Sequence, residues 1–298
     1  MVGYYVDLEN GKGSSVQEGC VLVDMKFSVL MSVYKNEKAE YLNTALKSIV
    51  NQSLMPNEII IVKDGILTDE LDKCLDDFYE AYENIVKVIP FAENRGLGLA
   101  LRDGVLACSN EYIARMDTDD IAFSNRFEEQ FEFLKKHEDI SLVGSWITEF
   151  SNDSLKPDTI TKLPCKHSDI VNYAKKRNPF RHMTVIFKKK AVLDSGNYRD
   201  FLWFEDYDLW VRIIQKGYKT ANIPKVLVNV RATDDMFARR GGLRYIKQEI
   251  RFQNSIRKQN FISMWNSIEN LIIRSIVRIF PNKLRVYCYK TMLRYSEK

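Results

Sequence analysis

The densest group of chemically active side chains is the acidic cluster Asp117-Thr118-Asp119-Asp120, which directly follows the apolar segment Ala114–Met116. Three carboxylates within four residues repel one another, and a bound cation normally offsets that cost. Oxygen-only ligands favour Mg²⁺ or Mn²⁺. Helix capping is the alternative role for these acids, but Ser124 is already placed to cap the helix that follows. The cluster is therefore interpreted as a metal site.

A second acidic pair, Glu205-Asp206, precedes an apolar helical segment that contains Trp210. One of the two acids could simply cap that helix. However, group transfer to a hydroxyl needs a carboxylate base within hydrogen-bond reach of the acceptor, and an acid at a helix N-terminus could supply it. A metal ion would complement such a base if the leaving group were a nucleotide diphosphate, because it neutralises charge on the departing oxygen.

Two turns that follow other predicted strands add candidate ligand-binding residues. Asp64 comes after Glu58–Val62 and could accept hydrogen bonds from a base or ribose, although Asp-Gly is also a good turn by itself. The turn Glu93–Gly98, with Arg95 and Gly96, opens a helix and could hold phosphate. Its glycine spacing does not fit a dinucleotide fingerprint, and no P-loop sequence occurs, so hydride transfer and ATP hydrolysis lack their main sequence support.

Two further polar segments could contact phosphate or an acceptor. One is Asn178–Met183, which contains His182. The other is Arg231–Gly242, which contains Arg239 and Arg240. The three histidines of the chain are too scattered for a His-x-x-x-His metal site, and a single histidine is more often structural.

The elements that must position these residues alternate between short β-branched runs and longer helical stretches, a pattern typical of βαβ units in a mainly parallel sheet. The predicted strands are Phe27–Val33, Glu58–Val62, Ile85–Ile89, Tyr112–Met116, Ser141–Phe150, Thr184–Lys188 and Val226–Val230. The predicted helices cover about 40–52, 68–83 and 96–107, Asn125–Lys136 and Tyr207–Gln215. Ligands bind such sheets at the carboxyl ends of their strands, where the acidic cluster lies.

Composition divides the chain of 298 residues into three parts. Residues 1–24 show no sustained period and are treated as an N-terminal extension. Residues 25–240 form the α/β catalytic domain. Residues 241–298 are helical in pattern and carry a net charge of +9, whereas the rest of the chain carries −5.

The basic tail contains an amphipathic segment, Phe261–Phe280, in which a narrow polar stripe crosses a broad apolar surface. We expect this segment either to pack on the catalytic domain or to lie on an anionic membrane surface. Nucleic acid is not expected as a partner, because the basic region lacks a recognisable reader motif. Five scattered cysteines indicate a reducing compartment. With no apolar run of about 18 residues and no signal peptide, the expected location is cytoplasmic, at or near the inner face of the membrane.

In this order, the segments resemble family 2 glycosyltransferases of the GT-A fold, over roughly Lys26–Arg231. The resemblance is carried by Phe27–Glu37, Ser48–Ser53, Val62–Gly65, Met116–Asp120 and Glu205-Asp206. The chain is similar in particular to the bacterial members that build capsule, O-antigen and amylovoran-type exopolysaccharide. The segments that carry this similarity are Ala114–Asp120, Arg177–Val185, Glu205–Arg212 and Val228–Gly242.

The resemblance implies a role for each candidate residue. Asp119 would bind Mn²⁺ or Mg²⁺ with Asp117 and Asp120, and Asp206 would be the catalytic base beside Glu205. The donor UDP-sugar would contact Ser32, Tyr34, Glu37, Asp64, Arg95, Gly96, Asp117 and Arg231. Acceptor or phosphate contacts would come from His182, Trp210, Arg239 and Arg240. Many members place a metal-binding histidine after the last strand; here that stretch is Arg231–Asp235, and Arg231 is expected to meet the diphosphate instead.

The implied reaction is inverting transfer of a hexose, with galactose favoured, from a UDP-sugar to a lipid-linked saccharide in bacterial surface polysaccharide biosynthesis. One alternative is a nucleotidyltransferase, but Ser32–Glu37 lacks the glycine-rich loop such enzymes carry after their first strand. The other is a non-enzymatic, membrane-associated assembly protein. The presence of Asp117, Asp119 and Asp206 argues against that alternative.

Overall fold

The computed structural model describes residues 25–151, 157, 159–232 and 242–279. The strands are β1 (Phe27–Val33), β2 (Glu58–Lys63), β3 (Val86–Pro90), β4 (Tyr112–Arg115), β5 (Ile121–Ala122), β6 (Ile140–Phe150), β7 (Thr159–Thr161), β8 (Ile186–Lys188) and β9 (Lys219–Arg231). The helices are α1 (Ala39–Val50), α2 (Asp69–Tyr82), α3 (Leu97–Ala107), α4 (Arg126–Lys136), α5 (His167–Ala174), α6 (Lys189–Asp194), α7 (Glu205–Gln215), α9 (Gly242–Lys258) and α10 (Met264–Ile279), and a 3-10 turn covers His182–Thr184.

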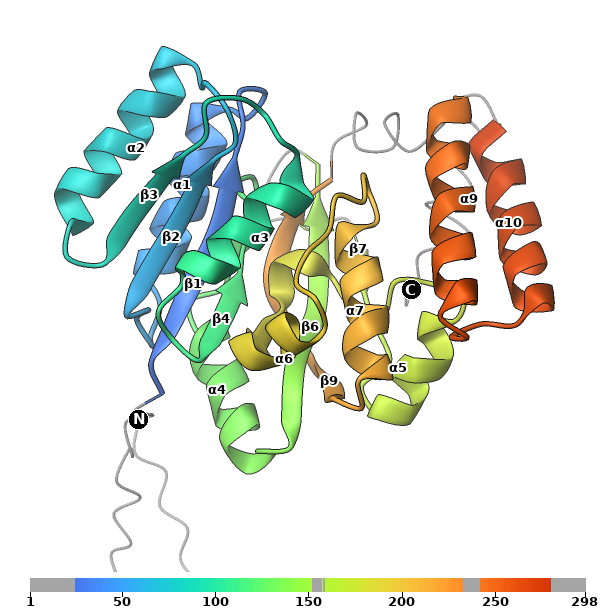
Figure 1. The fold of residues 1–298 in the computed structure, drawn as a ribbon. Coiled ribbons are helices and arrows are strands. Elements are labelled where there is room, and N and C mark those ends of the chain that lie inside the picture. Colours follow the sequence, from blue (N-terminus) through green and yellow to red (C-terminus); the bar gives the residue numbers. More distant parts are fainter. Residues whose placement is uncertain (1–24, 152–156, 158, 233–241, 280–298) are drawn as a thin grey trace, which may run out of the picture.

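One mixed sheet connects these strands in the order β3-β2-β1-β4-β8-β6-β9-β5, with β7 paired to β6. The β3-β2-β1-β4 half is parallel throughout. β8 lies antiparallel to both β4 and β6, whereas β6 and β9 are parallel. The parallel half arises because helices connect its strands, so each strand begins at the same edge of the sheet. The predicted mainly parallel α/β sheet is thus confirmed (Figure 1).

Helices cover both faces of the sheet, since β1 and β2 are apolar on both sides. On one face α1, α2 and α4 pack against the strands, and Phe27 of β1 meets Phe127 of α4 edge to face at 5.0 Å between ring centres. On the other face α3, α5, α6 and α7 pack around the buried Trp210. This burial on both sides fixes the strands, and with them the edge at which their carboxyl ends lie.

The predicted C-terminal helical extension is also present, as α9 and α10 side by side (Figure 1). α9 packs on α7 through aromatic contacts. Phe252 stacks on Phe204 with ring centres 4.9 Å apart, and lies 4.5 Å from the ring of Tyr207. The start of α7 is therefore supported by α9.

The helix predicted over Asn125–Lys136 is α4, but the prediction that Ser124 caps it is wrong. Asn125 occupies the N-cap position, without a capping hydrogen bond from its side chain. The Ser124 carbonyl instead accepts a hydrogen bond from Ser53 N at 2.7 Å, which ties the α4 start to the end of α1. The acids of the cluster do not cap α4 either, so capping does not explain them.

Two parts of the second half of the chain differ from the predicted elements. The last strand was expected over Val226–Val230 and in fact spans the whole of β9. Pro224 is tolerated within it because it lies at an irregularity of the pairing with β6, between Ser145 and Trp146. No pattern predicted α5 or α6, since helices of eight and six residues are too short to show a clear helical period.

Candidate active site

The carboxyl ends of β1, β2 and β4 meet at one edge of the sheet. Asp64 N donates to the Val33 carbonyl at 2.8 Å, and Met116 N donates to the Leu30 carbonyl at 3.2 Å. Residues that follow each of these parallel strands therefore share one edge, the usual ligand-binding edge of an open α/β sheet. That edge carries the turn after β1, Asp64 and the acidic cluster.

The acidic cluster is compact. Asp117, Asp119 and Asp120 each offer a carboxylate oxygen, and these oxygens lie within 4.8 Å of one another. The hydroxyl of Thr118 donates to Glu37 Oε2 at 2.8 Å, which joins the cluster to the turn after β1. The structure thus brings the predicted donor-site residue Glu37 to the predicted metal ligands.

Ionising these carboxylates is unfavourable without a counter-charge. Burial, together with Asp117 and Glu37, raises the pKa of Asp119 to about 7. Burial and the neighbouring Asp119 raise the pKa of Asp120 well above its ordinary value. Asp120 Oδ2 is buried with no hydrogen-bond partner among the described residues. A divalent cation would relieve both features, so these residues fit the predicted Mn²⁺ or Mg²⁺.

Arg231, the last residue of β9, borders the cluster. Its backbone N–H donates to Asp120 Oδ1 at 2.9 Å, and its Nε donates to the Asp119 carbonyl at 3.3 Å. Its guanidinium lies 3.7 Å from the centre of the Tyr41 ring and 4.7 Å from that of Phe150. Stacking on two rings fixes the guanidinium beside the metal-ligand candidates, where a planar cation can meet phosphate oxygens.

Arg115, at the end of β4, is a site residue to which the sequence motif gave no role. Its side chain is buried and forms an ion pair with Asp117. Its charge also acts against the high pKa of Asp120 and of Glu205. One buried guanidinium therefore influences both acidic groups. A charged residue at the end of an otherwise apolar strand is the signal that could have identified it.

The second acidic group lies at the N-terminus of α7. Burial and the neighbouring Asp206 raise the pKa of Glu205 to about 8, and Asp117 adds to this shift. Glu205 and Asp117 are far apart in sequence, yet each lies within electrostatic reach of the other. The two predicted acidic groups therefore belong to one site.

Asp206 is held in place by hydrogen bonds from the protein. Its Oδ2 accepts a hydrogen bond from Asn178 Nδ2 at 2.7 Å, and its Oδ1 accepts one from Tyr207 N at 2.6 Å. Asn178 was predicted only as part of a polar segment, and the structure brings it directly to Asp206. A fixed carboxylate of this kind can take a proton from a hydroxyl placed next to it.

The first turn of α3 packs closely against this second group. A Cβ atom on Gly98 would overlap the Arg199 carbonyl oxygen and lie 3.2 Å from Cβ of Glu205. Only glycine allows that approach, so Gly98 contributes to the position of Glu205 rather than to a dinucleotide fingerprint.

Asp64 ties β2 to the turn before α3. Its carboxylate accepts hydrogen bonds from Arg95 N at 2.7 Å and from Gly96 N and Asn94 Nδ2 at 3.0 Å each. Since a carboxylate offers about four acceptor positions, one remains for a base or ribose. The Arg95 guanidinium instead pairs with Asp103 at 2.9 Å. The structure thus brings the backbone of Arg95 to the edge, while its side chain contacts α3.

Two residues predicted for acceptor contacts lie in the core instead of at this edge. Trp210 is fully buried, and its ring meets Phe180 and His182 edge to face. His182 shares a hydrogen bond of 2.8 Å with the Tyr198 hydroxyl. Burial, with the charge of Arg115 nearby, holds the pKa of His182 well below its ordinary range. The neutral His182 and Trp210 therefore form the packed layer beneath the site.

The remaining predicted residues lie at the end of β1 or outside the described chain. Ser32 and Tyr34 are partly buried at the carboxyl end of that strand, close to Glu37 in sequence. Arg239 and Arg240 lie outside the described residues.

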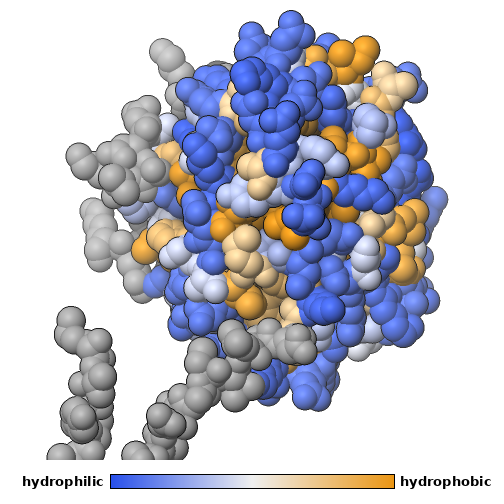
Figure 2. Space-filling view, turned by 90° about the vertical axis from the view of Figure 1, so that its left-hand side faces the viewer, coloured by the Kyte–Doolittle hydropathy of each residue, from blue (hydrophilic) through white to orange (hydrophobic). Residues whose placement is uncertain are grey.

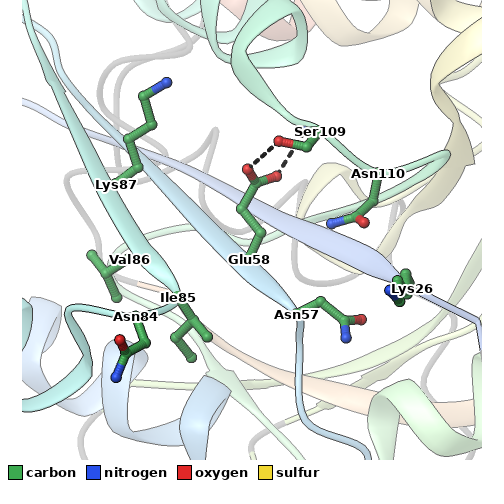
Figure 3. Close-up of a pocket in the computed structure, with 9 residues that line it drawn as sticks. All are labelled: Lys26, Asn57, Glu58, Asn84, Ile85, Val86, Lys87, Ser109 and Asn110. Carbon is green, nitrogen blue, oxygen red and sulfur yellow. Dashed lines mark hydrogen bonds between the residues drawn. The ribbon is translucent and has the colours of Figure 1, made fainter.

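A hollow at the opposite ends of the strands is separate from this site. Its lining residues are Lys26, Asn57, Glu58, Asn84, Ile85, Val86, Lys87, Ser109 and Asn110 (Figure 3). Glu58 begins β2, whereas Asp64 follows its end, so the hollow and the acidic cluster lie at opposite edges of the sheet. Ser109 donates to the Glu58 carboxylate from its N–H at 2.8 Å and from its hydroxyl at 2.7 Å, so this acid already has protein partners.

Comparison with known sequences agrees with the site. Residues 28–195 match the family described as Glycosyl transferase family 2. The chain is 38% identical over 269 residues to the UDP-Gal:alpha-D-GlcNAc-diphosphoundecaprenol beta-1,3-galactosyltransferase of Escherichia coli, covering 90% of this chain and 97% of that protein. It is 36% identical to the amylovoran biosynthesis glycosyltransferase AmsE of Erwinia amylovora, covering 89% and 98% of the two chains.

Solved structures share the fold at low sequence identity. S. aureus TarS 1-349 in complex with UDP-GlcNAc has a TM-score of 0.59 at 16% identity, covering 91% of this chain and 76% of that one. Mannosyltransferase PcManGT from Pyrobaculum calidifontis, in complex with GDP-Man and Mn²⁺, has a TM-score of 0.58 at 14% identity, covering 88% and 72%. The sheet and its helices are thus GT-A-like, and the chain belongs to glycosyltransferase family 2.

Proposed function

We propose that this glycosyltransferase moves a hexose, with galactose favoured, from a UDP-sugar to a lipid-linked saccharide during bacterial surface polysaccharide biosynthesis. The observation that carries the proposal is that Glu205 lies within electrostatic reach of Asp117, and that the buried Arg115 acts on both acidic groups. The relative from Escherichia coli is named for UDP-Gal and for an acceptor on diphosphoundecaprenol, and its similarity spans nearly the whole of both chains.

In this proposal the two acidic groups have different roles in the reaction. Asp119, with Asp117 and Asp120, would hold a divalent cation, which when bound supplies positive charge next to the diphosphate of the donor. Arg231 would meet the same diphosphate from its stacked position. Asp64 would contact the uracil base, and Glu37, which accepts a hydrogen bond from Thr118, would complete the donor side.

Asp206 would act as the catalytic base. The acceptor hydroxyl gives its proton to an Asp206 carboxylate oxygen, while the hydroxyl oxygen forms a bond to the anomeric carbon. The bond from that carbon to the UDP oxygen breaks, and UDP leaves with the electron pair. Attack opposite the leaving group inverts the anomeric configuration. Asn178 would keep the carboxylate of Asp206 turned toward the hydroxyl.

A transfer assay tests this proposal. The purified chain is incubated with Mn²⁺ or Mg²⁺, a panel of UDP-sugars and a short-chain lipid diphosphate that bears N-acetylglucosamine. Asp119→Ala and Asp206→Asn should each lower turnover by at least about a hundredfold. Asp76→Asn, which removes an exposed charge on α2, serves as the control and should retain full turnover. Wild-type turnover in either site variant would remove that residue from the mechanism, and no transfer from any UDP-sugar would overturn the donor class.

A further inference from the structure

α10 turns its polar stripe toward the protein. Ser267 and Asn270 are buried, with 3% and 5% of their surfaces exposed. Asn270 Nδ2 donates to the Lys175 carbonyl at 2.9 Å. Arg274 forms an ion pair with the buried Glu249 of α9 and donates to a backbone carbonyl in the turn after α5. Hydrogen bonds, rather than apolar packing, therefore fasten this side of α10.

The apolar side of α10 consequently faces outward. Trp265 is 80% exposed and Ile272 is 56% exposed. They share this side with three further exposed apolar residues, Met264, Ile268 and Ile273. Trp265, Ile268 and Ile272 follow each other at helical spacing, so they form one continuous surface. We refer to these five residues as the α10 outer face.

The opposite end of the sheet shows the ordinary arrangement. On α2, Leu71, Leu75 and Phe78 are buried, and acidic residues face solvent. The surface on that side of the molecule is mostly hydrophilic, with apolar residues in small separate groups (Figure 2). A helix with its apolar side outward is unfavourable in water, so the α10 outer face indicates an interaction surface.

The charge of the α9–α10 pair distinguishes between two candidate partners, a second copy of the chain and an anionic lipid surface. α9 and α10 together carry seven Lys and Arg residues and only two acids. Both acids are paired with cations, Glu249 with Arg274 and Glu269 with Lys176 at 3.7 Å. A second copy of the chain would bring the same positive charge to the contact. An anionic lipid surface offers negative headgroups and hydrocarbon together, and tryptophan favours that boundary.

From this we infer that the α10 outer face docks onto the surface of an anionic membrane. Within the described residues, no helix is long and apolar enough to cross a bilayer. The helix would lie in the plane of the headgroups, with Trp265 and Ile272 entering the acyl boundary.

The contacts of α10 connect such docking to the site. Asn270 and Arg274 bind the carbonyls of Lys175 and Lys176, and Asn178, two residues further on, holds Asp206. Docking through α10 would thus act on the segment that orients the proposed base; this consequence rests on the proposed function, whereas the docking surface itself does not.

Vesicle flotation of the full chain tests the inference. The wild-type protein should float with vesicles of phosphatidylglycerol and phosphatidylcholine, and bind vesicles of phosphatidylcholine alone at least about tenfold more weakly. The double variant Trp265→Ser/Ile272→Ser should bind the anionic vesicles about tenfold more weakly than wild type. Leu106→Ser, which removes an exposed apolar side chain on α3, is the matched control and should float like wild type.

Two results would overturn the inference. One is equal flotation of the double variant and the wild type. The other is a wild-type protein that does not bind vesicles but sediments as a dimer, while the double variant sediments as a monomer. In that case the partner of the α10 outer face would be a second copy of the chain. Flotation needs neither donor nor acceptor, so its failure is separate from failure of the transferase proposal. The double variant should keep wild-type transfer to a water-soluble acceptor.

Discussion

The metal-ligand candidates and the base candidate of the site differ in their protein partners. In the cluster after β4, Asp120 Oδ2 has no partner among the described residues, and the pKa of Asp119 is raised by burial and by neighbouring acids. At the start of α7, by contrast, Asp206 accepts two hydrogen bonds from the protein. The cluster thus has a buried carboxylate oxygen that a bound cation could contact, whereas the base candidate Asp206 already has hydrogen-bond donors from the protein. Similar acidic motifs can thus be told apart by their partners.

The largest expected effect separates metal binding from proton transfer. Asp119→Asn should lower Mn²⁺-dependent affinity for UDP by at least about tenfold, because it removes a metal ligand. Asp206→Asn should bind UDP and Mn²⁺ as the wild type does, although it no longer supports transfer. Isothermal titration calorimetry measures both.

Removal of the metal by EDTA provides the control for this distinction between metal binding and proton transfer. In EDTA the wild type and Asp119→Asn should bind UDP with equally low affinity. If Asp206→Asn instead loses Mn²⁺-dependent UDP binding, the two groups are not functionally distinct and the comparison fails.

A smaller effect is expected from the hydrogen bond to the base. Asn178→Ala leaves Asp206 with one fewer donor, and turnover should fall by about tenfold while the KM for the donor stays near its wild-type value. Asn172→Ala, on the exposed side of α5, is the control. An unchanged turnover in Asn178→Ala would mean that the backbone N–H of Tyr207 is sufficient to orient the carboxylate.

The smallest effect concerns stability of the metal-free protein as a function of pH. The pKa of Asp119 is about 7 in the folded chain against an ordinary value of 3.8. Between these values the folded chain binds more protons than the unfolded chain, so its free energy of unfolding should fall as pH rises from about 4 to about 7. Asp119→Asn should reduce this slope, while Asp120 and Glu205 keep part of it, since their pKa values are raised as well.

Thermal melting in EDTA at several pH values measures that slope. Added Mn²⁺ should reverse it for the wild type, because the metal binds the ionised carboxylates and its affinity rises with pH up to about 7. A metal-free melting temperature that rises between pH 5 and pH 7 in the wild type but not in Asp119→Asn would contradict the raised pKa.

The sequence was sufficient for the parallel half of the fold and for the two acidic groups, because both depend on local patterns. Apolar runs such as Phe27–Val33 predict strands, and acids that directly follow a strand lie at its carboxyl end. The proximity of Glu205 to Asp117 appears only in the structure, since no local pattern relates residues so far apart in sequence.

Other features could not be predicted, because they depend on contacts made only in three dimensions. The burial of Trp210 beneath the site follows from packing with residues of several elements. The orientation of α10 likewise depends on carbonyl acceptors in the turn after α5 and on Glu249, which no helical period reveals. Hydrophobic periodicity locates a helix, but it does not show which side of that helix will find packing or hydrogen-bond partners in the rest of the chain.

The contacts of Tyr207 have a consequence for protein engineering. This residue follows the proposed base directly; its hydroxyl donates to the Ala174 carbonyl at 2.8 Å, and its ring packs against Phe252 of α9. Truncation of the chain before α9 would expose that ring and loosen the start of α7. Chimeras that exchange acceptor preference between related transferases should therefore transfer α5, α7 and the α9–α10 pair as one block.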